Sequence, residues 1–133
     1  MQINRVAKEL SAEAGLGIRI QALIGGAAAS RQIEGLKKKP HIVVGSAGRI
    51  THLLDLGKLK LRDTAWLVLD EADRMLDMGF IPDIERIFKL TPPKKQTLFF
   101  SATMPPEITR LTKQFLNDPL RIEVARPATT AVL

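Results

Sequence analysis

Apolar residues along the chain follow two spacings, one typical of buried strands and one typical of helices. Short apolar runs bounded by glycine, proline or polar residues predict strands at 18–24, 42–44, 65–69 and 97–100, with a weaker last strand at 121–124. Apolar residues at helical spacing, ended by glycine or proline, predict helices near 3–14, 27–36, 48–56, 81–88 and 106–116. The chain therefore alternates between helix and strand from end to end.

This alternation predicts the fold class. Strands separated by helices form parallel β-α-β crossovers, which cover a sheet with helices on both faces. We therefore expect a three-layer α/β domain at 1–124. The small, featureless segment 125–133 is expected to begin an interdomain linker. Trp66 lies inside an apolar run, so we expect it to pack within the strand layer rather than to stack on a base.

Composition narrows the class of protein. The 133 residues, 45% of them hydrophobic, fit one ordinary domain with its own core. Cysteine is absent and only two histidines occur, so a disulfide framework or a zinc site is not expected. The N-terminus lacks the apolar stretch of a secretory signal, and no apolar run reaches the length of a membrane span. We expect a cytoplasmic protein with no membrane partner.

The chain is basic, with a formal net charge of +6. Such an excess suggests a polyanionic partner, most commonly nucleic acid, although a solubilising surface is the alternative. Aromatic residues are only 5% of the chain, which favours contact with backbone phosphates over base stacking. The loop cations are expected to be solvated surface and none is assigned to RNA: Lys37, Lys38, Lys39, Lys58, Lys60, Arg62, Lys94 and Lys95.

Candidate chemistry gathers directly after the strand at 65–69, where Asp70, Glu71 and Asp73 follow. In open α/β sheets, ligands bind at the carboxyl ends of the strands. Carboxylates there can hold a hydrated Mg²⁺ and orient a water molecule on a nucleotide phosphate. The alternative for each acid is a helix N-cap or a favourable interaction with a helix dipole.

Other segments join these acids in a recognisable order. Ser101-Ala102-Thr103 ends the next strand, Ser46-Ala47-Gly48-Arg49 follows an earlier one, and Gly25-Gly26 follows the first. Together with Asp70-Glu71-Ala72-Asp73, they resemble the DEAD-box ATP-dependent RNA helicases, specifically their first RecA-like domain of the P-loop NTPase type. The resemblance covers essentially the whole chain and extends to Gln32 and to residues 74–80.

Chemistry and the resemblance together suggest roles for the acids and hydroxyls. Asp70 would hold Mg²⁺ through water, and Glu71 would polarise the attacking water as general base. Asp73 would hydrogen-bond the hydroxyl of Ser101 or Thr103, a link that in the family couples the nucleotide site to RNA binding and strand separation. The alternative for the two hydroxyls is capping of the following helix. We treat all five residues as candidate catalytic residues, with Asp70 and Glu71 also contacting the cofactor.

The resemblance also implies RNA-backbone contacts at Gly25, Gly26, Ser46, Gly48 and Arg49. Glycine lets a phosphate approach the main chain, N–H groups at a helix start bind anions, and arginine can hold a phosphate with two hydrogen bonds. The alternative for the glycines is ordinary turn chemistry. Serine and alanine stand where the family has threonine and proline, which keeps a hydroxyl but frees the turn.

Several parts of the family pattern are not found in these 133 residues. There is no Gly-x-x-x-x-Gly-Lys-Ser/Thr loop to cradle phosphates, no upstream glutamine motif and no Pro-Thr-Arg-Glu-Leu-Ala segment. A second RecA-like domain with an arginine finger is missing too. We therefore expect a RecA-like domain that is incomplete on its N-terminal side. ATP and Mg²⁺ would be cofactors of the full-length enzyme, neither binding tightly to this fragment, which alone would be inactive.

The missing phosphate-loop strand has a structural consequence. In the family it lies beside the strand that ends in Ser101, so the strand at 97–100 should have an unpaired edge. Exposed apolar edges pair with other chains, which predicts self-association.

Three functions fit the sequence. The first is a catalytically incomplete part of an ATP-dependent RNA helicase, with RNA and the second RecA-like domain as partners. The second is a stand-alone RNA-backbone binding module without ATPase activity. The third is an unrelated α/β enzyme acting on another phosphate ester, although no lysine or arginine clamp near the acids supports it.

Overall fold

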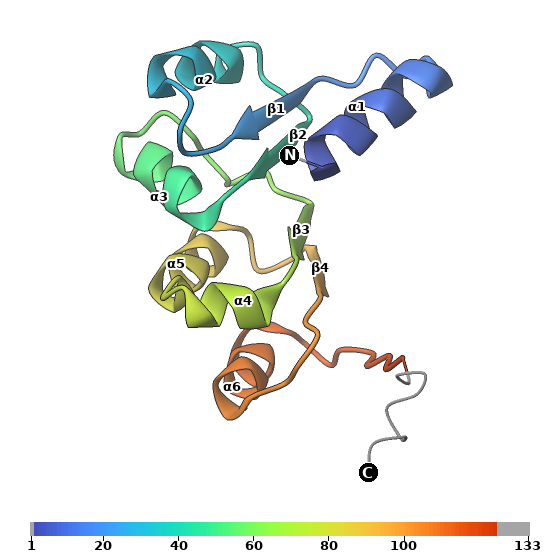
Figure 1. The fold of residues 1–133 in the computed structure, drawn as a ribbon, viewed down its shortest axis with the longest axis vertical. Coiled ribbons are helices and arrows are strands. Elements are labelled where there is room, and N and C mark those ends of the chain that lie inside the picture. The colour runs from blue at the N-terminus through green and yellow to red at the C-terminus, as the bar shows by residue number, and fades with distance from the viewer. Residues whose placement is uncertain (1, 125–133) are drawn as a thin grey trace.

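The computed structural model describes residues 2–124, and its helices and strands alternate along the chain (Figure 1). Residues 1 and 125–133 lie outside the described part, and with them the expected linker. The elements in chain order are α1 (Gln2–Ala14), β1 (Ile20–Leu23), α2 (Ala29–Leu36), β2 (Ile42–Gly45), α3 (Ala47–Asp55), β3 (Trp66–Leu69), α4 (Ala72–Asp77), α5 (Ile81–Leu90), β4 (Gln96–Phe99) and α6 (Pro106–Phe115).

All strand pairing among these elements is parallel. Strand β1 pairs with β2, with Ile20 opposite Ile42, and β3 pairs with β4, with Trp66 opposite Gln96. Each pair is joined through helices, which confirms the predicted α/β class with parallel crossovers. Within residues 2–124 the two pairs form separate two-stranded sheets rather than one continuous sheet.

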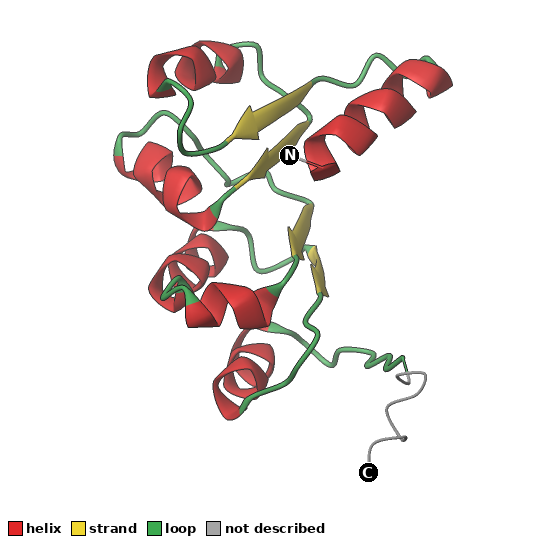
Figure 2. Cartoon of the chain, viewed as in Figure 1, coloured by secondary structure: helices red, strands yellow, loops and turns green. Residues whose placement is uncertain are grey.

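The two strand pairs differ in how helices cover them. Helix α1 lies on one side of β1–β2, and α2 and α3 lie on the other side (Figure 1). Helices α4, α5 and α6 all lie on one side of β3–β4 (Figure 2). Successive side chains of a strand point to opposite faces, so Leu67 and Leu69 of β3 turn toward these helices. The three-layer arrangement is thus complete only around β1–β2.

The uncovered face of β3–β4 corrects one expectation from the sequence. Trp66 is 61% exposed and Val68 is 54% exposed, so Trp66 does not pack inside the domain. Leu98 of β4 lies on the same face and is 36% exposed. The apolar run indicated a strand that could be buried on both faces, but the described residues supply helices for only one.

The core is divided between the two halves. Near β1–β2, a buried cluster combines Leu23 with Leu53 and Leu59. Around β3–β4 there are two further clusters of buried side chains: Leu69, Ile84 and Phe88 in one, and Ala72, Ile108 and Leu111 in the other. Burial of such side chains, at about 25 cal/mol per Å² of apolar surface, holds α3, α5 and α6 to the strands, whereas α1 contributes no residue to these clusters.

The boundaries differ from the sequence expectations in two places. Helix α4 was not predicted, because its six residues directly follow the acids and are too short to show a helical period. The strand expected at 121–124 is wrong, since these residues form no strand and Ile122 and Val124 are 79% and 87% exposed. The helix expected at 48–56 does end before a glycine: Gly57 follows the C-cap of α3 with φ +69°.

No helix in residues 2–124 is both long and apolar enough to cross a membrane.

Candidate functional site

The carboxyl ends of β3 and β4 lie side by side. Main-chain pairing continues past the strand ends: the N–H of Phe100 donates to the carbonyl of Leu69 at 2.8 Å, and the N–H of Ala72 donates to that of Phe100 at 3.0 Å. The acids that follow β3 and the hydroxyls that follow β4 therefore meet at one edge of the sheet, as parallel pairing predicts.

A polar link joins the two strand ends. The Thr103 hydroxyl donates to one carboxylate oxygen of Asp73 at 2.8 Å, and the main-chain N–H of Thr103 donates to the same oxygen at 3.0 Å. The other oxygen accepts the N–H of Arg74 at 3.0 Å. These donors, the Thr103 hydroxyl foremost, lower the pKa of Asp73 below its ordinary value of 3.8. The predicted hydrogen bond from Thr103 to Asp73 is confirmed.

Ser101 makes a different contact from the one expected. Its hydroxyl accepts the main-chain N–H of Asp73 at 3.1 Å and donates to the carbonyl of Thr103 at 2.6 Å. It thus pairs one of the first N–H groups of α4, which have no partner within their own helix. Ser101 holds the start of α4 against the end of β4.

Asp73 lies in the first turn of α4, as the helix-dipole alternative has it, but the capping alternatives for Glu71 and for the cap of α6 do not hold. The N-cap of α6 is Pro105, and no side chain caps that helix, so neither Ser101 nor Thr103 does so. Glu71 occupies the N-cap position of α4 but makes no side-chain cap hydrogen bond. Local helix capping therefore does not account for the hydroxyls or for Glu71.

Glu71 has an unusual backbone conformation. Its φ of +57° and ψ of +47° lie in the left-handed region, which costs an L-residue about 1–2 kcal/mol. Its side chain is exposed and lies 3.4 Å from the guanidinium of Arg74, a weak surface pair. The tight turn between β3 and α4 leaves the Glu71 carboxylate free to reach a ligand.

The number and exposure of the carboxylates at this edge determine which kind of metal site they can form. No group of three or more His, Cys, Asp or Glu residues that could hold a metal occurs in the described part of the chain. Asp70 and Glu71 are both exposed, and Asp73 is engaged by Thr103. Magnesium usually keeps several waters and binds one or two carboxylates together with substrate phosphates. The two free acids fit that mode of binding and not an all-protein metal site.

A shallow depression of about 230 Å³ connects these acids to the end of β2. Ser46, which directly follows β2, lines it together with Asp70 and Glu71. The other lining residues are Ala47, Arg74, Met75, Met78 and Phe80. The structure therefore brings Ser46 to the candidate nucleotide acids, although the sequence analysis placed it with the RNA contacts.

The remaining candidate RNA contacts lie at the end of the β1–β2 pair. Gly25 and Gly26 form the turn after β1, and a side chain at either would meet nothing within 4 Å. The φ of +83° at Gly26 requires glycine for the turn itself. Turn chemistry therefore explains Gly26, while the open space beside both glycines leaves the main chain accessible.

Arg49 is tied to this glycine turn through Gln32. The guanidinium of Arg49 donates to the Gln32 side-chain carbonyl at 2.9 Å and to the carbonyl of Ala27 at 3.3 Å. Gln32 is only 5% exposed, and its amide donates to the carbonyl of Ile24 at 2.8 Å. Gln32 thus positions Arg49 beside the turn, a role that the sequence did not predict, although Gln32 is part of the family resemblance.

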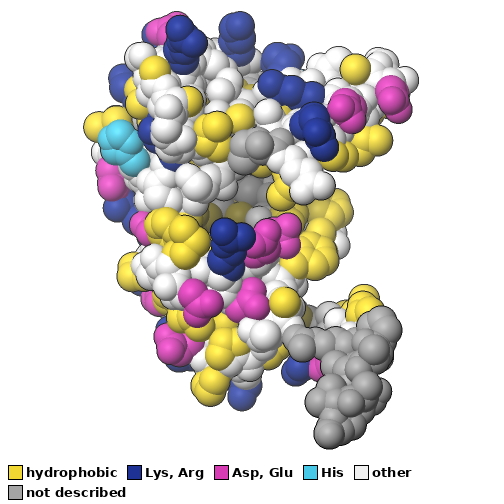
Figure 3. All heavy atoms as spheres, viewed as in Figure 1, with side chains coloured by type: hydrophobic (Ala, Val, Ile, Leu, Met, Phe, Trp, Pro, Cys, Tyr) yellow, Lys and Arg dark blue, Asp and Glu magenta, His cyan; other side chains and the backbone are white. Residues whose placement is uncertain are grey.

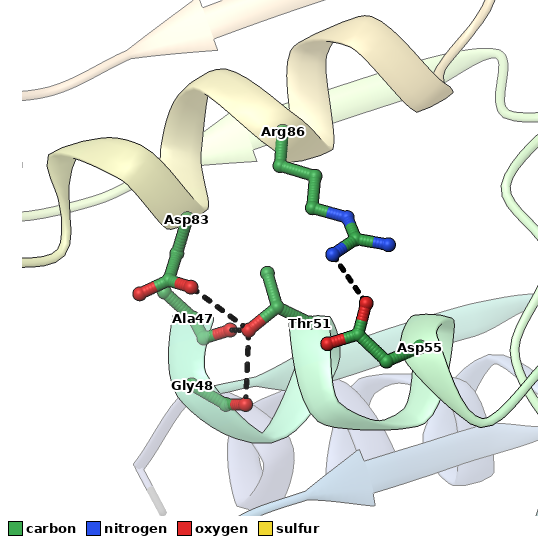
Figure 4. A network of polar contacts seen from close by, with 6 residues as sticks. All are labelled: Ala47, Gly48, Thr51, Asp55, Asp83 and Arg86. Atoms are coloured by element: carbon green, nitrogen blue, oxygen red, sulfur yellow. Dashed lines mark hydrogen bonds and ion pairs between the residues drawn. The ribbon is translucent and has the colours of Figure 1, made fainter.

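A further polar network joins the two halves of the molecule between α3 and α5 (Figure 4). The Thr51 hydroxyl lies 3.0 Å from the Asp83 carboxylate and also within hydrogen-bond distance of its own helix's carbonyls. One turn further along α3, Asp55 forms an ion pair with Arg86. Sequence reasoning missed this network because the residues that it joins across the two helices are more than 30 positions apart in the chain and carry no motif.

The chain matches the family model for the DEAD/DEAH box helicases over residues 1–111. It is 47% identical over 129 residues to RNA helicase CrhR of Synechocystis, covering 97% of this chain and 26% of the relative. It is 50% identical over 116 residues to ATP-dependent RNA helicase CshA of Listeria monocytogenes, covering 87% of this chain and 22% of the relative. The chain thus spans about a quarter of the length of these curated relatives.

Solved structures give the same result at the level of the fold. A hypothetical ATP-dependent RNA helicase from Sulfolobus tokodaii superposes with a TM-score of 0.82 at 32% identity, over 88% of this chain and 34% of that one. A DEAD box protein from Methanococcus jannaschii superposes with a TM-score of 0.74 at 39% identity, over 86% and 33%.

Proposed function

This chain belongs to the DEAD/DEAH box helicase family, and from that premise we propose that it is part of an ATP-dependent RNA helicase. Its architecture is that of the family's RecA-like domain. In the complete protein, ATP hydrolysis would be coupled to RNA binding and to local unwinding of duplexes. A second RecA-like domain would be a partner of this one, and the setting would be cytoplasmic.

The observation that carries this proposal is the Asp73–Thr103 link between neighbouring strand ends. With Asp73 engaged there, Asp70 and Glu71 stay free at the same edge. Asp70 would hold Mg²⁺ through its waters, and Glu71 would accept a proton from the attacking water. Bound Mg²⁺-ATP supplies the reacting phosphate and neutralises its charge. Ser101 and Thr103 keep the acid-bearing turn in register with β4.

On the RNA side, contacts would be to the sugar-phosphate backbone. Arg49, oriented by Gln32, can offer its remaining N–H groups to a phosphate beside the open Gly25-Gly26 turn. Gly48 and the hydroxyl of Ser46 lie at the start of α3, where main-chain N–H groups favour anions. None of these groups reads a base edge, so binding would be independent of sequence.

For the isolated 133 residues we propose no ATP turnover, no unwinding and only weak nucleotide binding. Positioning of the triphosphate supplies most of the catalysis in phosphoryl transfer, and these residues contain no phosphate-binding loop. The stand-alone RNA-backbone module remains the second candidate, since Arg49 is held beside the glycine turn by contacts with Gln32 and Ala27 alone.

Measurements of ATP hydrolysis by the complete helicase test the role proposed for Glu71. In the complete helicase that contains this segment, Glu71→Gln should lower RNA-stimulated ATP turnover about 10²- to 10⁴-fold, the range for loss of a general base. Glu9→Gln, which changes an exposed acid on α1, is the matched control and should leave turnover unchanged. Full turnover in the Glu71 variant would contradict the helicase role.

The isolated chain provides the complementary test. Turnover by the 133 residues alone that disappears in Glu71→Gln would show that the chain is active after all. Salt-dependent RNA binding by the chain, together with unchanged turnover in the Glu71 variant of the complete protein, would favour the binding module.

We also propose that the isolated chain self-associates through the outer edge of β4. In residues 2–124, β4 pairs only with β3, and the apolar Leu98 and Phe100 are exposed there. Such edges invite strand pairing. Light scattering should show concentration-dependent dimers that Leu98→Lys abolishes, and a clean monomer at high concentration would contradict the proposal.

A further inference from the structure

The basic charge of this chain is concentrated at the edge of the sheets opposite to the candidate site. The loops that precede strands, at 15–19, 37–41, 56–65 and 91–95, contain nine lysine or arginine residues and one carboxylate: Arg19, Lys37, Lys38, Lys39, Lys58, Lys60, Arg62, Lys94 and Lys95, with Asp63. The loops that follow strands contain no cation and two carboxylates, Asp70 and Glu71. The net +6 of the whole chain is therefore carried at the amino ends of the strands.

Part of this charge is held in a fixed cluster by hydrogen bonds. The guanidinium of Arg19 donates to the carbonyls of Lys38 and Lys39, each at 3.0 Å. The main-chain N–H of Arg19 donates to Nδ1 of His41 at 2.9 Å, just where β1 and β2 begin to pair. Arg19 thus places its own charge inside the lysine run. We call Arg19, Lys37, Lys38 and Lys39 the amino-edge cluster.

Most of the cluster has no anionic partner within the described residues. Lys37 pairs with Glu34 at 2.8 Å, while Arg19, Lys38 and Lys39 form no ion pair there. All four residues are exposed. In the space-filling view, lysine and arginine side chains gather at the top of the molecule, over α2 and the start of β1 (Figure 3). Like charges held together repel one another, so the cluster is best stabilised by an external polyanion.

We propose that the amino-edge cluster is a second RNA-binding surface, which takes the sugar-phosphate backbone of a single strand. It lies at the amino ends of β1 and β2, whereas the RNA contacts proposed above lie at their carboxyl ends. Flexible lysine ammonium groups make point-charge contacts with phosphates and read no sequence. The loops 15–19 and 37–41 contain no Phe, Tyr or Trp, so charge rather than stacking on large aromatic rings would dominate binding.

RNA fits this surface better than an acidic protein does. A single strand presents one phosphate per nucleotide in a row, which matches consecutive lysines and an adjacent arginine. The choice of RNA rests on the proposed helicase function, which already brings RNA to this molecule. Two surfaces on opposite edges would let one domain hold a strand flanking the one being unwound.

The test removes two charges at the cluster and two elsewhere. Lys38→Gln with Lys39→Asn is the test variant, because Asn tolerates the φ of +53° at position 39. Arg5→Gln with Lys8→Gln is the control, since both are exposed on α1 and form no ion pair within residues 2–124. Circular dichroism checks that both variants fold. Binding of a labelled 12-nucleotide uridine RNA is followed by fluorescence anisotropy at several salt concentrations.

The test variant should bind about tenfold more weakly, and its salt slope should fall by about 1.4, or about 0.7 for each lost phosphate contact. Arg49→Gln should weaken binding separately, and its effect should add to that of the test variant because the sites are distinct. These results would establish the second surface.

Three results would overturn it. The control variant could lose as much affinity as the test variant, which would mean that net charge alone matters. Poly-glutamate of equal charge could displace the RNA as well as unlabelled RNA does, which would point to an acidic protein. The parent chain could fail to bind RNA. None of these affects ATP turnover in the complete protein, so the proposed helicase function is tested separately.

Discussion

The β1–β2 half of the chain (residues 2–61) and the β3–β4 half (residues 62–116) both use a polar link near their strand ends, but in different surroundings. In the first half Gln32, 5% exposed, joins Arg49 to the glycine turn. In the second half the Asp73–Thr103 bond is open to solvent. A link anchored on a buried side chain holds one geometry, whereas an exposed link can be remade when a ligand arrives. This difference fits the proposal that the first half contacts the RNA backbone and the second half carries the nucleotide chemistry.

The halves also differ in how their sheets are covered. Helices lie on both sides of β1–β2 but on one side of β3–β4, where Trp66 and Val68 are exposed (Figure 2). The half with the candidate catalytic acids is thus the one with an open apolar face. This half nevertheless holds most of the buried apolar side chains, which lie on its covered side, and it contacts the first half through α3 and α5.

The largest expected loss of stability comes from truncating one buried core side chain at a time. Leu53→Ala in the first half and Ile84→Ala in the second each remove a fully buried side chain and should cost about 2–5 kcal/mol of unfolding free energy. Val68→Thr on the open face is the control and should cost less than about 0.5 kcal/mol.

Two probes show whether the halves unfold together. The only tryptophan, Trp66, reports on the second half, while far-ultraviolet circular dichroism reports on both. If the halves form one cooperative unit, Leu53→Ala shifts both denaturation curves equally. A curve in which only circular dichroism shifts would show that the halves unfold separately and that the α3–α5 contact is weak.

The α3–α5 contact itself is the next largest effect (Figure 4). Thr51→Val keeps the shape of a 6%-exposed side chain but leaves the Asp83 carboxylate without that donor, which should cost about 1–2 kcal/mol. Arg86→Gln removes an exposed ion pair with Asp55 and should cost less than about 1 kcal/mol. Thr51→Ser restores the hydroxyl and should recover most of the loss in urea denaturation. Equal losses in Thr51→Val and Thr51→Ser would show that the hydroxyl does not matter.

Sequence periodicity predicted the class of fold and most of the elements. Apolar runs and helical spacing placed β1–β4 and five helices, most of which turn one apolar side toward the core. Helix α1 followed from its spacing alone, since it buries no residue within the described part of the chain. The strand expected at 121–124 failed because alternation shows that a segment can pair, not that a partner strand is present. Exposure of Trp66 has the same cause, since what covers a face depends on distant parts of the chain.

Some contacts of the candidate site were likewise predictable from the sequence, and others were not. The Asp73–Thr103 bond was predictable because both residues follow neighbouring parallel strands and their side chains are complementary. The Ser101 contact with the main chain of α4 was not, because a six-residue helix leaves no periodic signal. The Thr51–Asp83 contact was not predictable for another reason: it joins α3 to α5, and the spacing of residues in the sequence does not indicate which helices contact each other.

A smaller effect should come from the strained turn at Glu71, which belongs to the open half. Glu71→Gly removes the cost of φ +57° and should stabilise the chain by about 1 kcal/mol, even though it deletes the proposed general base. Glu71→Gln keeps the strain and should change stability by less than about 0.5 kcal/mol, the worth of the surface pair with Arg74. Thermal and urea denaturation of both variants measure this. A glycine variant no more stable than the glutamine variant would mean that the turn is not strained.

The smallest expected effect on stability comes from the exposed Asp73–Thr103 link, the counterpart in the second half of the link through Gln32 in the first half. Thr103→Val removes the main donor that lowers the pKa of Asp73, so this pKa should rise toward 3.8, while the Thr103 N–H keeps part of the shift. Because the folded-state pKa is lowered, the link stabilises the fold fully above the ordinary pKa and loses this effect as pH falls through the lowered one. Parent and variant should therefore differ in stability at neutral pH and converge in acid. NMR titration of the Asp73 carboxyl carbon measures this pKa, and Thr103→Ser, which keeps the hydroxyl, is the control. An unchanged pKa in Thr103→Val would show that the Thr103 hydroxyl does not hold Asp73 in solution. The link between the strand ends would then depend on the main chain alone.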